Sequence, residues 1–416
     1  MKKMFFLLLI FLGTFNVNSA ESPPPSPGPV LYAPRTPAEL QALSAVLLDA
    51  ATGVVLYAKN PDLPISPASL TKLMTIHVAQ KEAARRGISV YDHVNIPKES
   101  WAVNQPPRSS LMFLAQGQTV NLHELFLGLA VPSGNDAAVA VALNFAPSVD
   151  GFAVMMNDEA AALGLSRTFF VEPSGISEKN ITTAMEFAIF CTEYIKLHPE
   201  NLKELHSVPE FAFPKIENVT AAQRNKPGTI VQGNHIGLLK TFEGVDGLKT
   251  GYIDEAGYNI ALTANRDGTR FVAVLLGVPA ELGSYWGSRA RDRDGRALLA
   301  WGYENFKTLR LPFPKLQPVR VWKGKNKYAG IVPKGPPVWT VMLDRGNDDL
   351  RWEIETFNLT APQTAGTQIG IIHLYDGEGK LGQMEILTES EIYKGGFFRS
   401  LWDSIVMLFT NKNNKK

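Results

Sequence analysis

The order of local patterns in this sequence predicts a mixed α/β (α+β) domain over residues 40–310, a small all-β sandwich domain over 313–390, and an amphipathic helix over 395–412. Three observations support this prediction. Strand-like runs at both ends of the first region enclose a block of helical patterns, helical periodicity stops after "LPFPKLQP", and large apolar residues return at helical spacing in the tail. A chain of 416 residues is long enough for two such domains.

The first 20 residues have the three parts of a secretory signal peptide. Two lysines precede the apolar run Met4–Leu12, and small or polar residues follow. The alternative is a membrane anchor, but this run is short for a bilayer span. A Pro-rich spacer over 21–39 comes next. We therefore expect an exported protein, in which the single cysteine, Cys191, is a small buried hydrophobic residue and no intrachain disulfide forms.

Strand and helix patterns then follow in order. Two β-type runs flank Asp49–Gly53 and predict a hairpin. The stretch Ser69–Arg86 has a helical pattern, Gly87 stands where a helix would end, and apolar residues cover most of its circumference, which predicts a buried helix. Further helices are predicted over 121–146 with a break at Pro132–Asn135, over 151–165 and over 182–198.

The residue pattern changes from helical to β-type over 245–277, where "NRDGT" predicts a hairpin turn. "RDGRALLAWGYENF" at 293–306 predicts a closing helix. Charges nearly cancel, with 41 Lys and Arg against 40 Asp and Glu, so no basic excess points to a nucleic-acid partner. Short strands of the second domain are predicted at 319–324, 338–343, 351–357, 367–375 and 382–387.

Three short motifs carry the chemical information. Ser69 and Lys72 stand one helical turn apart, Ser133-Gly-Asn135 lies at the break between two helices, and Lys249-Thr-Gly enters the β-rich region. Each motif alone has an ordinary explanation. A Ser-x-x-Lys pair arises by chance in a chain of this length, Asn135 could cap a helix, and the third motif could be a turn before a strand.

The trio in this order is characteristic of class A β-lactamases and penicillin-binding proteins. The flanking segments "SPASLTKLMT", "SGNDAAVA" and "VDGLKTGYIDEAGYN" resemble the serine-type D-Ala-D-Ala carboxypeptidases, the low-molecular-mass penicillin-binding proteins. The resemblance is strong over about 40–310 and looser over the β domain and tail. It implies a serine β-lactamase/transpeptidase-like fold for the first domain.

The resemblance also implies roles for the motif residues. Ser69 would be the nucleophile, at the N-terminal end of a helix that favours developing negative charge. Lys72 would take its proton, which requires a pKa far below the usual value near 10.4. We expect burial and the second cation, Lys249, to lower it. Ser133 would relay a proton to the leaving amine.

Substrate contacts follow from the same resemblance. Asn135 would hold a substrate amide, Lys249 and Thr250 its terminal carboxylate, and Gly251 would leave room for its backbone. The backbone N–H groups of Ser69 and Tyr252 would bind the oxyanion. Two positions depart from the family pattern, which has His where Tyr252 stands and Arg where His235 stands. Arg291 is the candidate for a further carboxylate-binding Arg, although Arg289 and Arg293 lie close enough in sequence to compete for that role.

The implied reaction removes the last D-Ala from a peptidoglycan stem peptide that ends in D-Ala-D-Ala, through an acyl-serine that β-lactams would trap. No cofactor is expected, and the seven histidines show no metal-ligand spacing. Alternatives are a D,D-endopeptidase of the same fold, a class A β-lactamase, and an inactive cell-wall-binding protein. The β-lactamase needs Glu-x-x-x-Asn for its deacylating water, whereas Ile176 stands four residues after Glu172.

The tail predicts a helix that lies in a membrane interface. It is too short and too interrupted by charge to span a bilayer, and lysines at its end suit acidic headgroups. The alternative is a helix that docks on its own domain. We expect the enzyme on the periplasmic face of the cytoplasmic membrane. The apolar residues at helical spacing are Phe397, Phe398, Leu401, Trp402, Ile405, Leu408 and Phe409.

Overall fold

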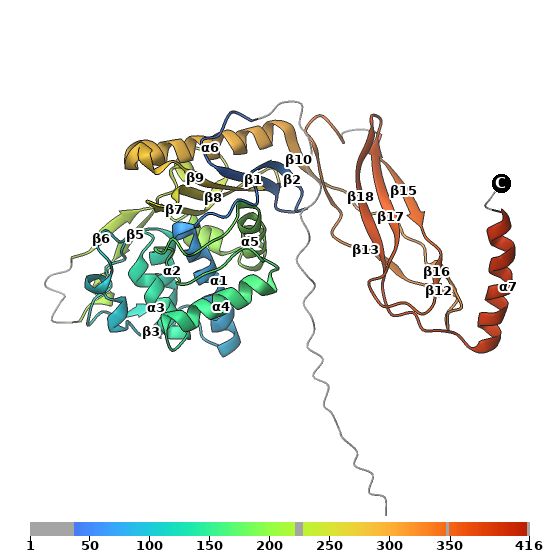
Figure 1. Ribbon diagram of the computed structural model, residues 1–416, viewed down its shortest axis with the longest axis horizontal. Helices are drawn as coiled ribbons and strands as arrows, with labels where there is room; N and C mark the ends of the chain where they lie inside the picture. Colours follow the sequence, from blue (N-terminus) through green and yellow to red (C-terminus); the bar gives the residue numbers. More distant parts are fainter. Residues whose placement is uncertain (1–36, 221–227, 347–348, 414–416) are drawn as a thin grey trace, which may run out of the picture.

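The computed structural model describes residues 37–220, 228–346 and 349–413, with the side chains of the last helix as far as Met407. The predicted signal peptide and nearly all of the predicted spacer lie outside these residues. Figure 1 shows a larger body of helices and one sheet, a smaller body of strands beside it, and a final helix along the far side of the strands.

A five-stranded antiparallel sheet forms the centre of the larger body, in the order β2-β1-β9-β8-β7. The predicted hairpins are present, and β1 pairs with β9, so the two ends of this region meet in one sheet. Asp267 and Gly268 both have positive φ in the turn between β8 and β9, as a tight hairpin requires. The strands are β1 Ser44–Asp49, β2 Val55–Lys59, β7 Val245–Ile253, β8 Gly257–Arg266 and β9 Thr269–Val278.

Helices cover both faces of this sheet (Figure 1). The strands are buried on both sides because alternate residues enter different cores: Val46 and Leu48 of β1 face the helical block, whereas Ala45 and Leu47 face α6. The helical block consists of α1 Thr71–Arg86, α2 Leu122–Ala130, α3 Asn135–Phe145, α4 Val149–Ala162 and α5 Ala184–Leu197, and α6 is Gly283–Asn305. Short strand pairs flank the block: β3 His93–Val94 with β4 Val120–Asn121, and β5 Glu210–Phe213 with β6 Ile230–Gly233.

Helix α1 runs through the core of this body. Its predicted burial is confirmed. The apolar residues on which the prediction rests are all at most 5% exposed: Leu70, Leu73, Met74, Ile76 and Val78. Gly87 ends the helix with φ +69°, a left-handed conformation that glycine adopts without strain. Lys72 is fully buried on the same helix, so α1 takes an amine into the interior. Cys191 is buried on α5, as predicted.

The closing helix differs from its prediction. Helix α6 begins at Gly283, ten residues before the predicted start, and Phe306 already belongs to strand β10. The added turns "GSYWGSRARD" lack an apolar stripe, so their periodicity gave no helical signal. They are held instead by the close packing of Gly287 against the Tyr258 ring, where a methyl group would lie 2.0 Å from a ring carbon.

The smaller body consists of strands, and each predicted strand has its counterpart. The residues of strand β10 were assigned from the sequence to the first domain, 40–310. This strand pairs with β14 of the second domain, so the pairing crosses the proposed boundary between 310 and 313. A four-stranded sheet has the order β13-β18-β17-β15. The strands are β10 Phe306–Arg310, β11 Val319–Trp322, β12 Tyr328–Ala329, β13 Ile331–Pro333, β14 Val338–Met342, β15 Arg351–Thr356, β16 Leu359–Thr360, β17 Gln368–Asp376 and β18 Gly379–Thr388.

A buried carboxylate links the two bodies. Asp49, at the end of β1, accepts hydrogen bonds from the hydroxyls of Thr308 on β10 and Thr340 on β14, at 2.8 and 2.9 Å. Burial raises the pKa of Asp49, and these hydrogen bonds oppose that rise. The strand body is therefore attached to the central sheet by a polar contact at the far end of β1.

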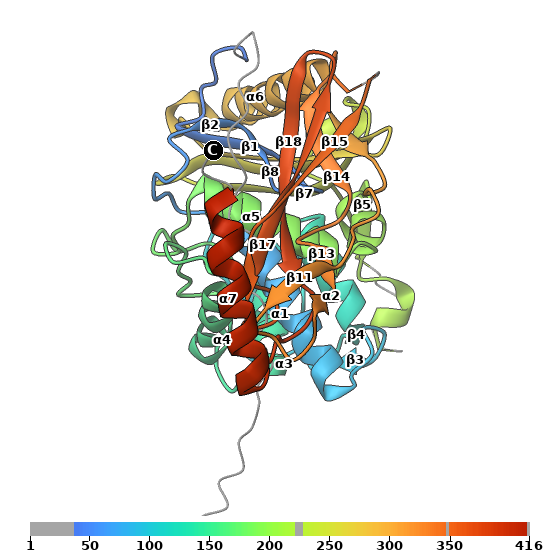
Figure 2. The same ribbon diagram turned by 90° about the vertical axis from the view of Figure 1, so that its right-hand side faces the viewer.

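Helix α7, Phe397–Asn413, lies beside the strand body, as Figure 2 shows from the side. Asp403 is 5% exposed and accepts a 2.6 Å hydrogen bond from the backbone N–H of Lys323. Most of the described apolar side chains of the helix are exposed, with Phe398 85% exposed and Trp402 66%, whereas Val406 and Met407 are partly covered. Among the described helices no single one is long and apolar enough to cross a membrane, and only α3 with α4, bent by 84° at their break, meets that test of length and composition as a pair.

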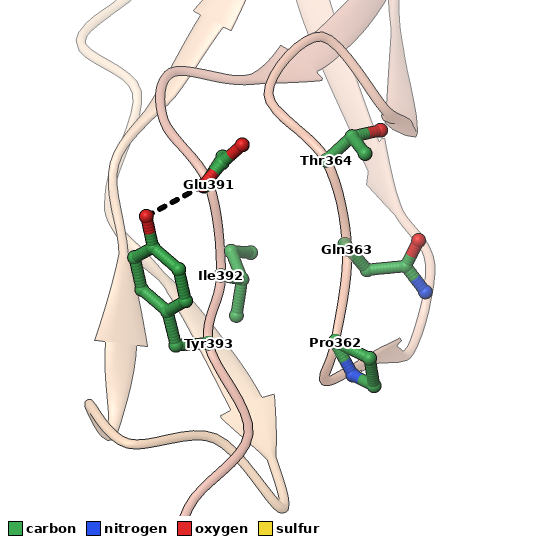
Figure 3. Close-up of a pocket in the computed structure, with 6 residues that line it drawn as sticks. All are labelled: Pro362, Gln363, Thr364, Glu391, Ile392 and Tyr393. Carbon is green, nitrogen blue, oxygen red and sulfur yellow. Dashed lines mark hydrogen bonds between the residues drawn. The ribbon is translucent and has the colours of Figure 1, made fainter. Parts of the chain in front are cut away.

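A shallow pocket of about 360 Å³ lies near the start of this helix, between the segments 362–364 and 391–393 (Figure 3). Its polar side chains are bonded within the protein. Tyr393 donates its hydroxyl proton to Glu391, Gln363 donates to the carbonyl of Thr360, and the Thr364 hydroxyl lies against that of Thr367. This pocket is far along the chain from the three motifs, which meet elsewhere.

Candidate active site

Ser69 lies in a short 3₁₀ turn, Ala68–Leu70, that leads directly into α1. The turn is fixed from the sheet, because Asn259 of β8 donates a 2.9 Å hydrogen bond to the carbonyl of Ser66. Lys72 follows in the first turn of α1, and its Nζ lies 3.0 Å from the Oγ of Ser69. The sequence therefore predicted correctly that one helical turn would bring this hydroxyl and this amine together.

The amine of Lys72 has three neighbours, and their chemistry differs. It lies 2.8 Å from Oδ1 of Asn135 and within hydrogen-bond distance of the carbonyl of Ser174, both of which can only accept. A neutral amine donates two N–H groups and accepts at one lone pair. If the two N–H groups point to Asn135 and Ser174, the lone pair points to the hydroxyl of Ser69. The arrangement thus suits proton transfer from Ser69 to Lys72.

The charge state of Lys72 follows from its burial. Burial lowers the pKa of its amine from 10.5 to about 7, while the carboxylates of Glu172 and Asp136 act in the opposite direction. A shift of this size corresponds to about 5 kcal/mol of differential stability between the two protonation states. A substantial share of Lys72 is therefore uncharged near neutral pH, as a general base requires.

Lys249, on β7, is also buried, at 1% exposure. The pKa of its amine is lowered well below 10.5, first by burial and then by the charges of Lys72 and Arg291. We expected burial and the charge of Lys249 together to lower the pKa of Lys72. Burial is the cause at Lys72, as expected, whereas the repulsion between the two amines lowers the pKa of Lys249. The two amines nevertheless belong to one site, because the charge of Lys72 is close enough to lower the pKa of Lys249.

The middle motif forms the turn between α2 and α3. Asn135 opens α3 without capping it: Gly134 occupies the cap position, and the Asn135 side chain turns to Lys72. Ser133 has φ +63°, an uncommon conformation for a non-glycine residue. Its hydroxyl is buried and has no hydrogen-bond partner among the residues that the structure describes. Such an unsatisfied hydroxyl in a polar site is available to a ligand.

The edge strand β7 brings the third motif against Ser69. A methyl group on Gly251 would lie 2.8 Å from the carbonyl oxygen of Pro67 and 3.1 Å from the backbone nitrogen of Ser69. We had attributed this glycine to the passage of a substrate backbone. Its observed reason is the close approach of β7 to the turn that carries Ser69. Thr250 is 5% exposed beside Lys249, whose Nζ donates to the Thr250 carbonyl at 3.2 Å.

The side chain of Tyr252, the residue after the third motif, contacts its own neighbours Tyr258 and Asp254. Its ring stacks on Tyr258 with centroids 4.3 Å apart, and its hydroxyl donates to Asp254 at 2.6 Å. That hydrogen bond raises the pKa of Tyr252. The preceding residue, Gly251, is the one that lies against the Ser69 backbone.

Of the three candidate arginines, Arg291 is the one at the site. It is 6% exposed, and its Nη2 donates to the carbonyl of His235 at 3.3 Å. The His235 imidazole has a pKa lowered to about 4 by partial desolvation and then by Lys249, Arg291 and Lys72, so it is neutral near pH 7 beside three cationic groups. Arg289 instead covers the Tyr285 ring, and Arg293 pairs with Asp294.

Sequence reasoning missed three polar residues that hold the site together. Asp136 accepts hydrogen bonds from the backbone N–H groups of residues 112–114 at 2.7 to 3.0 Å and so fixes a loop beside the middle motif. Ser174 supplies the carbonyl that faces Lys72, and Glu172 holds the turn around it. Position 136 directly follows the motif, but nothing in the local sequence shows which loop it holds.

Comparison with known proteins gives a consistent result. The family model for D-alanyl-D-alanine carboxypeptidases matches residues 32–280. The chain belongs to the D-alanyl-D-alanine carboxypeptidase family.

Relatives in the family match over most of both chains. The D-alanyl-D-alanine carboxypeptidase DacA of Haemophilus influenzae is 32% identical over 380 residues, covering 89% of this chain and 90% of that protein. DacD of Salmonella typhimurium is 33% identical, covering 90% and 92%. The crystal structure of penicillin binding protein 5 from Haemophilus influenzae aligns with a TM-score of 0.73 at 29% identity, covering 86% of this chain and 100% of that one. The predicted serine β-lactamase/transpeptidase-like fold is thereby confirmed.

Proposed function

We propose that this chain removes the terminal D-Ala from peptidoglycan stem peptides with Ser69 as nucleophile and Lys72 as general base. The observation that carries the proposal is the environment of the Lys72 amine. Two obligate acceptors, Asn135 Oδ1 and the Ser174 carbonyl, take its N–H groups and leave its lone pair to the Ser69 hydroxyl, and burial lowers its pKa so that a substantial share of the amine is uncharged near pH 7. No cofactor is needed for this chemistry.

The acylation step follows from these positions. The Ser69 oxygen attacks the carbonyl carbon of the penultimate D-Ala while its proton passes to Lys72, and the resulting oxyanion lies between the backbone N–H groups of Ser69 and Tyr252. The C–N bond then breaks. The proton travels from Lys72 through the Ser133 hydroxyl to the leaving amine, and D-Ala departs. The Ser133 hydroxyl suits such a relay because it is buried and otherwise unsatisfied.

The substrate carboxylate fits the cationic side of the site. Lys249 and Arg291 are both buried, and among the described residues Arg291 pairs with Asp292 at 2.7 Å whereas Lys249 has no carboxylate partner, so a ligand carboxylate would relieve the repulsion between the two and favour the charged form of Lys249. A charged Lys249 in turn disfavours the charged form of Lys72. Thr250 adds a hydroxyl on the same strand, and Asn135 offers its remaining amide N–H groups to a substrate amide. β-Lactams carry the same carboxylate and a reactive amide, so they acylate Ser69 in the same position.

The β-lactamase alternative needs a carboxylate free to activate water, and Glu172 is not free. Both of its oxygens already accept hydrogen bonds from the loop that follows it. Slow hydrolysis of a penicilloyl adduct is therefore expected, rather than rapid penicillin turnover.

Free D-alanine measured after incubation with a peptide ending in D-Ala-D-Ala tests this function. We expect stoichiometric release of one D-Ala per peptide, and a penicillin-treated enzyme that releases none. The same peptide ending in L-Ala-L-Ala serves as control. Rapid penicillin turnover without D-Ala release would contradict the proposal, as would cleavage of cross-linked peptides alone, which belongs to an endopeptidase.

We further propose an export and membrane arrangement for the chain: residues 1–20 as signal peptide, 21–39 as spacer, 40–310 as catalytic domain, 313–390 as an all-β spacer and 395–412 as the membrane-binding helix. The enzyme would then act in the periplasm at the cytoplasmic membrane. The exposed apolar face of α7 supports this, because the polar face, through Asp403, is the one attached to the protein.

Truncation after Tyr393 is expected to release the enzyme from membranes while D-Ala release stays unchanged, since the described side chains of α7 form no hydrogen bond or ion pair with the motif residues. Co-sedimentation with vesicles that contain anionic lipid measures the binding. A Trp402→Asp variant should lose binding in the same way, whereas Asp403→Asn, on the attached face, should keep it. Persistent binding of the truncated chain would disprove the anchor.

A further inference from the structure

The loop that follows α4 makes two contacts with the catalytic helix. The carbonyl of Pro173 accepts a 2.6 Å hydrogen bond from the hydroxyl of Thr75, and the carbonyl of Ser174 accepts one from the amine of Lys72. The next residue, Gly175, packs so closely under the Ser69 turn that a methyl group would lie 1.8 Å from the carbonyl oxygen of Ala68. The loop therefore forms one wall of the site, against the Ser69 turn and the first turn of α1.

One side chain holds this wall in shape. The Glu172 carboxylate accepts hydrogen bonds from the backbone N–H and hydroxyl of Ser174 at 2.7 and 2.5 Å, and from the backbone N–H of Gly175 at 2.6 Å. Asn180 donates to it at 2.9 Å and also reaches the hydroxyl of Thr71, the residue before Lys72. The carboxylate thus closes the turn on itself and ties it to the start of α1.

We propose that Glu172 is a positioning residue for Lys72: it holds the 173–175 turn so that the Ser174 carbonyl faces the amine, and it places a negative charge beside that amine. This inference rests on the proposed function, because it concerns the base of the same reaction. It assigns no contact between Glu172 and substrate.

The two parts of this role have opposite consequences. The shape of the turn fixes the direction of the Lys72 N–H groups and so favours proton transfer. The charge works against it, since Glu172 and Asp136 favour the protonated amine, while burial favours the neutral one. The other charged groups at the site are Lys249 and Arg291, together with Asp292, which pairs with Arg291 at 2.7 Å, and His235 is neutral. Loss of the Glu172 charge should therefore make Lys72 a base at lower pH, even as the loss of shape slows the reaction.

The test is the pH dependence of the second-order rate constant for acylation by benzylpenicillin, in wild type and in Glu172→Gln. We expect the plateau rate to fall by about 10-fold, because the Gln amide keeps one acceptor oxygen and the donors to the other oxygen lose theirs. We expect the midpoint of the acid limb to move to lower pH by about half a unit or more. Mass spectrometry of the adduct on Ser69 in both proteins shows separately whether the proposed function holds.

Two further variants complete the design. Glu178→Gln removes the same charge from an exposed position of the same loop and should leave both rate and midpoint unchanged. Glu172→Asp keeps the charge, so its midpoint should match wild type while its plateau falls, and it provides the comparison if the Gln variant does not fold. A slower Glu172→Gln enzyme with an unmoved or raised midpoint would overturn the proposal, as would a shifted midpoint in Glu172→Asp. Normal acylation with abolished deacylation would also overturn it, because Glu172 would then act on the water.

Discussion

Ser69→Ala is expected to abolish covalent labelling by penicillin and to lower D-Ala release by on the order of 10⁵-fold, since no other hydroxyl reaches the position of the nucleophile. The Ser133 hydroxyl is the nearest alternative in the motifs, but it belongs to the turn between α2 and α3 and not to the helix end that faces β7. The fold should persist, because the Ser69 side chain is only partly buried and the change removes a single oxygen atom.

Peptide mapping of the penicilloyl adduct measures this result. In wild type the added mass should lie on the peptide that contains Ser69, and in Ser69→Ala it should be absent at every site. Ser89→Ala, an exposed serine in a loop, is the matched control and should label normally. An adduct on any other residue of the wild-type protein would refute the assignment of the nucleophile.

Lys72→Met is expected to lower the acylation rate by about 10³-fold or more, because the general base is lost while a side chain of similar length fills the buried space. In wild type the pKa of Lys72 is lowered to about 7, so the neutral, active form gains as the pH rises through that value. The wild-type acylation rate should therefore rise with a midpoint near pH 7. The remaining activity of the variant should lack this step.

The same variant has a second, opposite consequence for stability. A lysine with a folded pKa below its unfolded value of 10.5 binds fewer protons when folded, so it destabilises the fold at all pH values below 10.5, by about 5 kcal/mol at and below pH 7. Methionine removes this cost, although Asn135 Oδ1 and the Ser174 carbonyl then lose a donor. We expect an equal or higher melting temperature together with the loss of activity, as in other sites that exchange stability for function.

Calorimetry and stopped-flow acylation over pH 5–9 check the two parts together. Lys81→Met, which removes an exposed amine from the same helix, should leave the midpoint near pH 7 unchanged. A melting temperature far below wild type would mean that Lys72 is a structural cation. A midpoint that survives in Lys72→Met would mean that another group supplies the base.

Much of the fold could be predicted because its signals are local. Helix α1 was recognisable from apolar residues over most of its circumference and a glycine at its end, and β8 and β9 from β-rich runs around a tight turn. The first turns of α6 were missed because their contact is made by a glycine, which carries no hydrophobic signal. Strand β10 was missed because its partner, β14, lies some thirty residues further along the chain.

The candidate site also has features that the local sequence predicts and features that only the structure decides. The one-turn spacing of Ser69 and Lys72 is local, and the three motifs were identified by their order and resemblance. The choice of Arg291 over Arg289 and Arg293 was open in the sequence, because all three have the same chemistry at neighbouring positions. The structure separates them by the face of α6 on which each lies: only Arg291 is buried beside His235.

The sequence by itself determined most of the elements, the motif residues and the family, since these depend on side-chain types and on spacing along the chain. Only the tertiary structure decided that Lys72 is suited to the proposed role of base. Its low pKa comes from helices packed around it, and the direction of its lone pair from Asn135 and Ser174, which lie far away in the sequence. Burial and hydrogen-bond direction are properties of the assembled core, so no local pattern contains them.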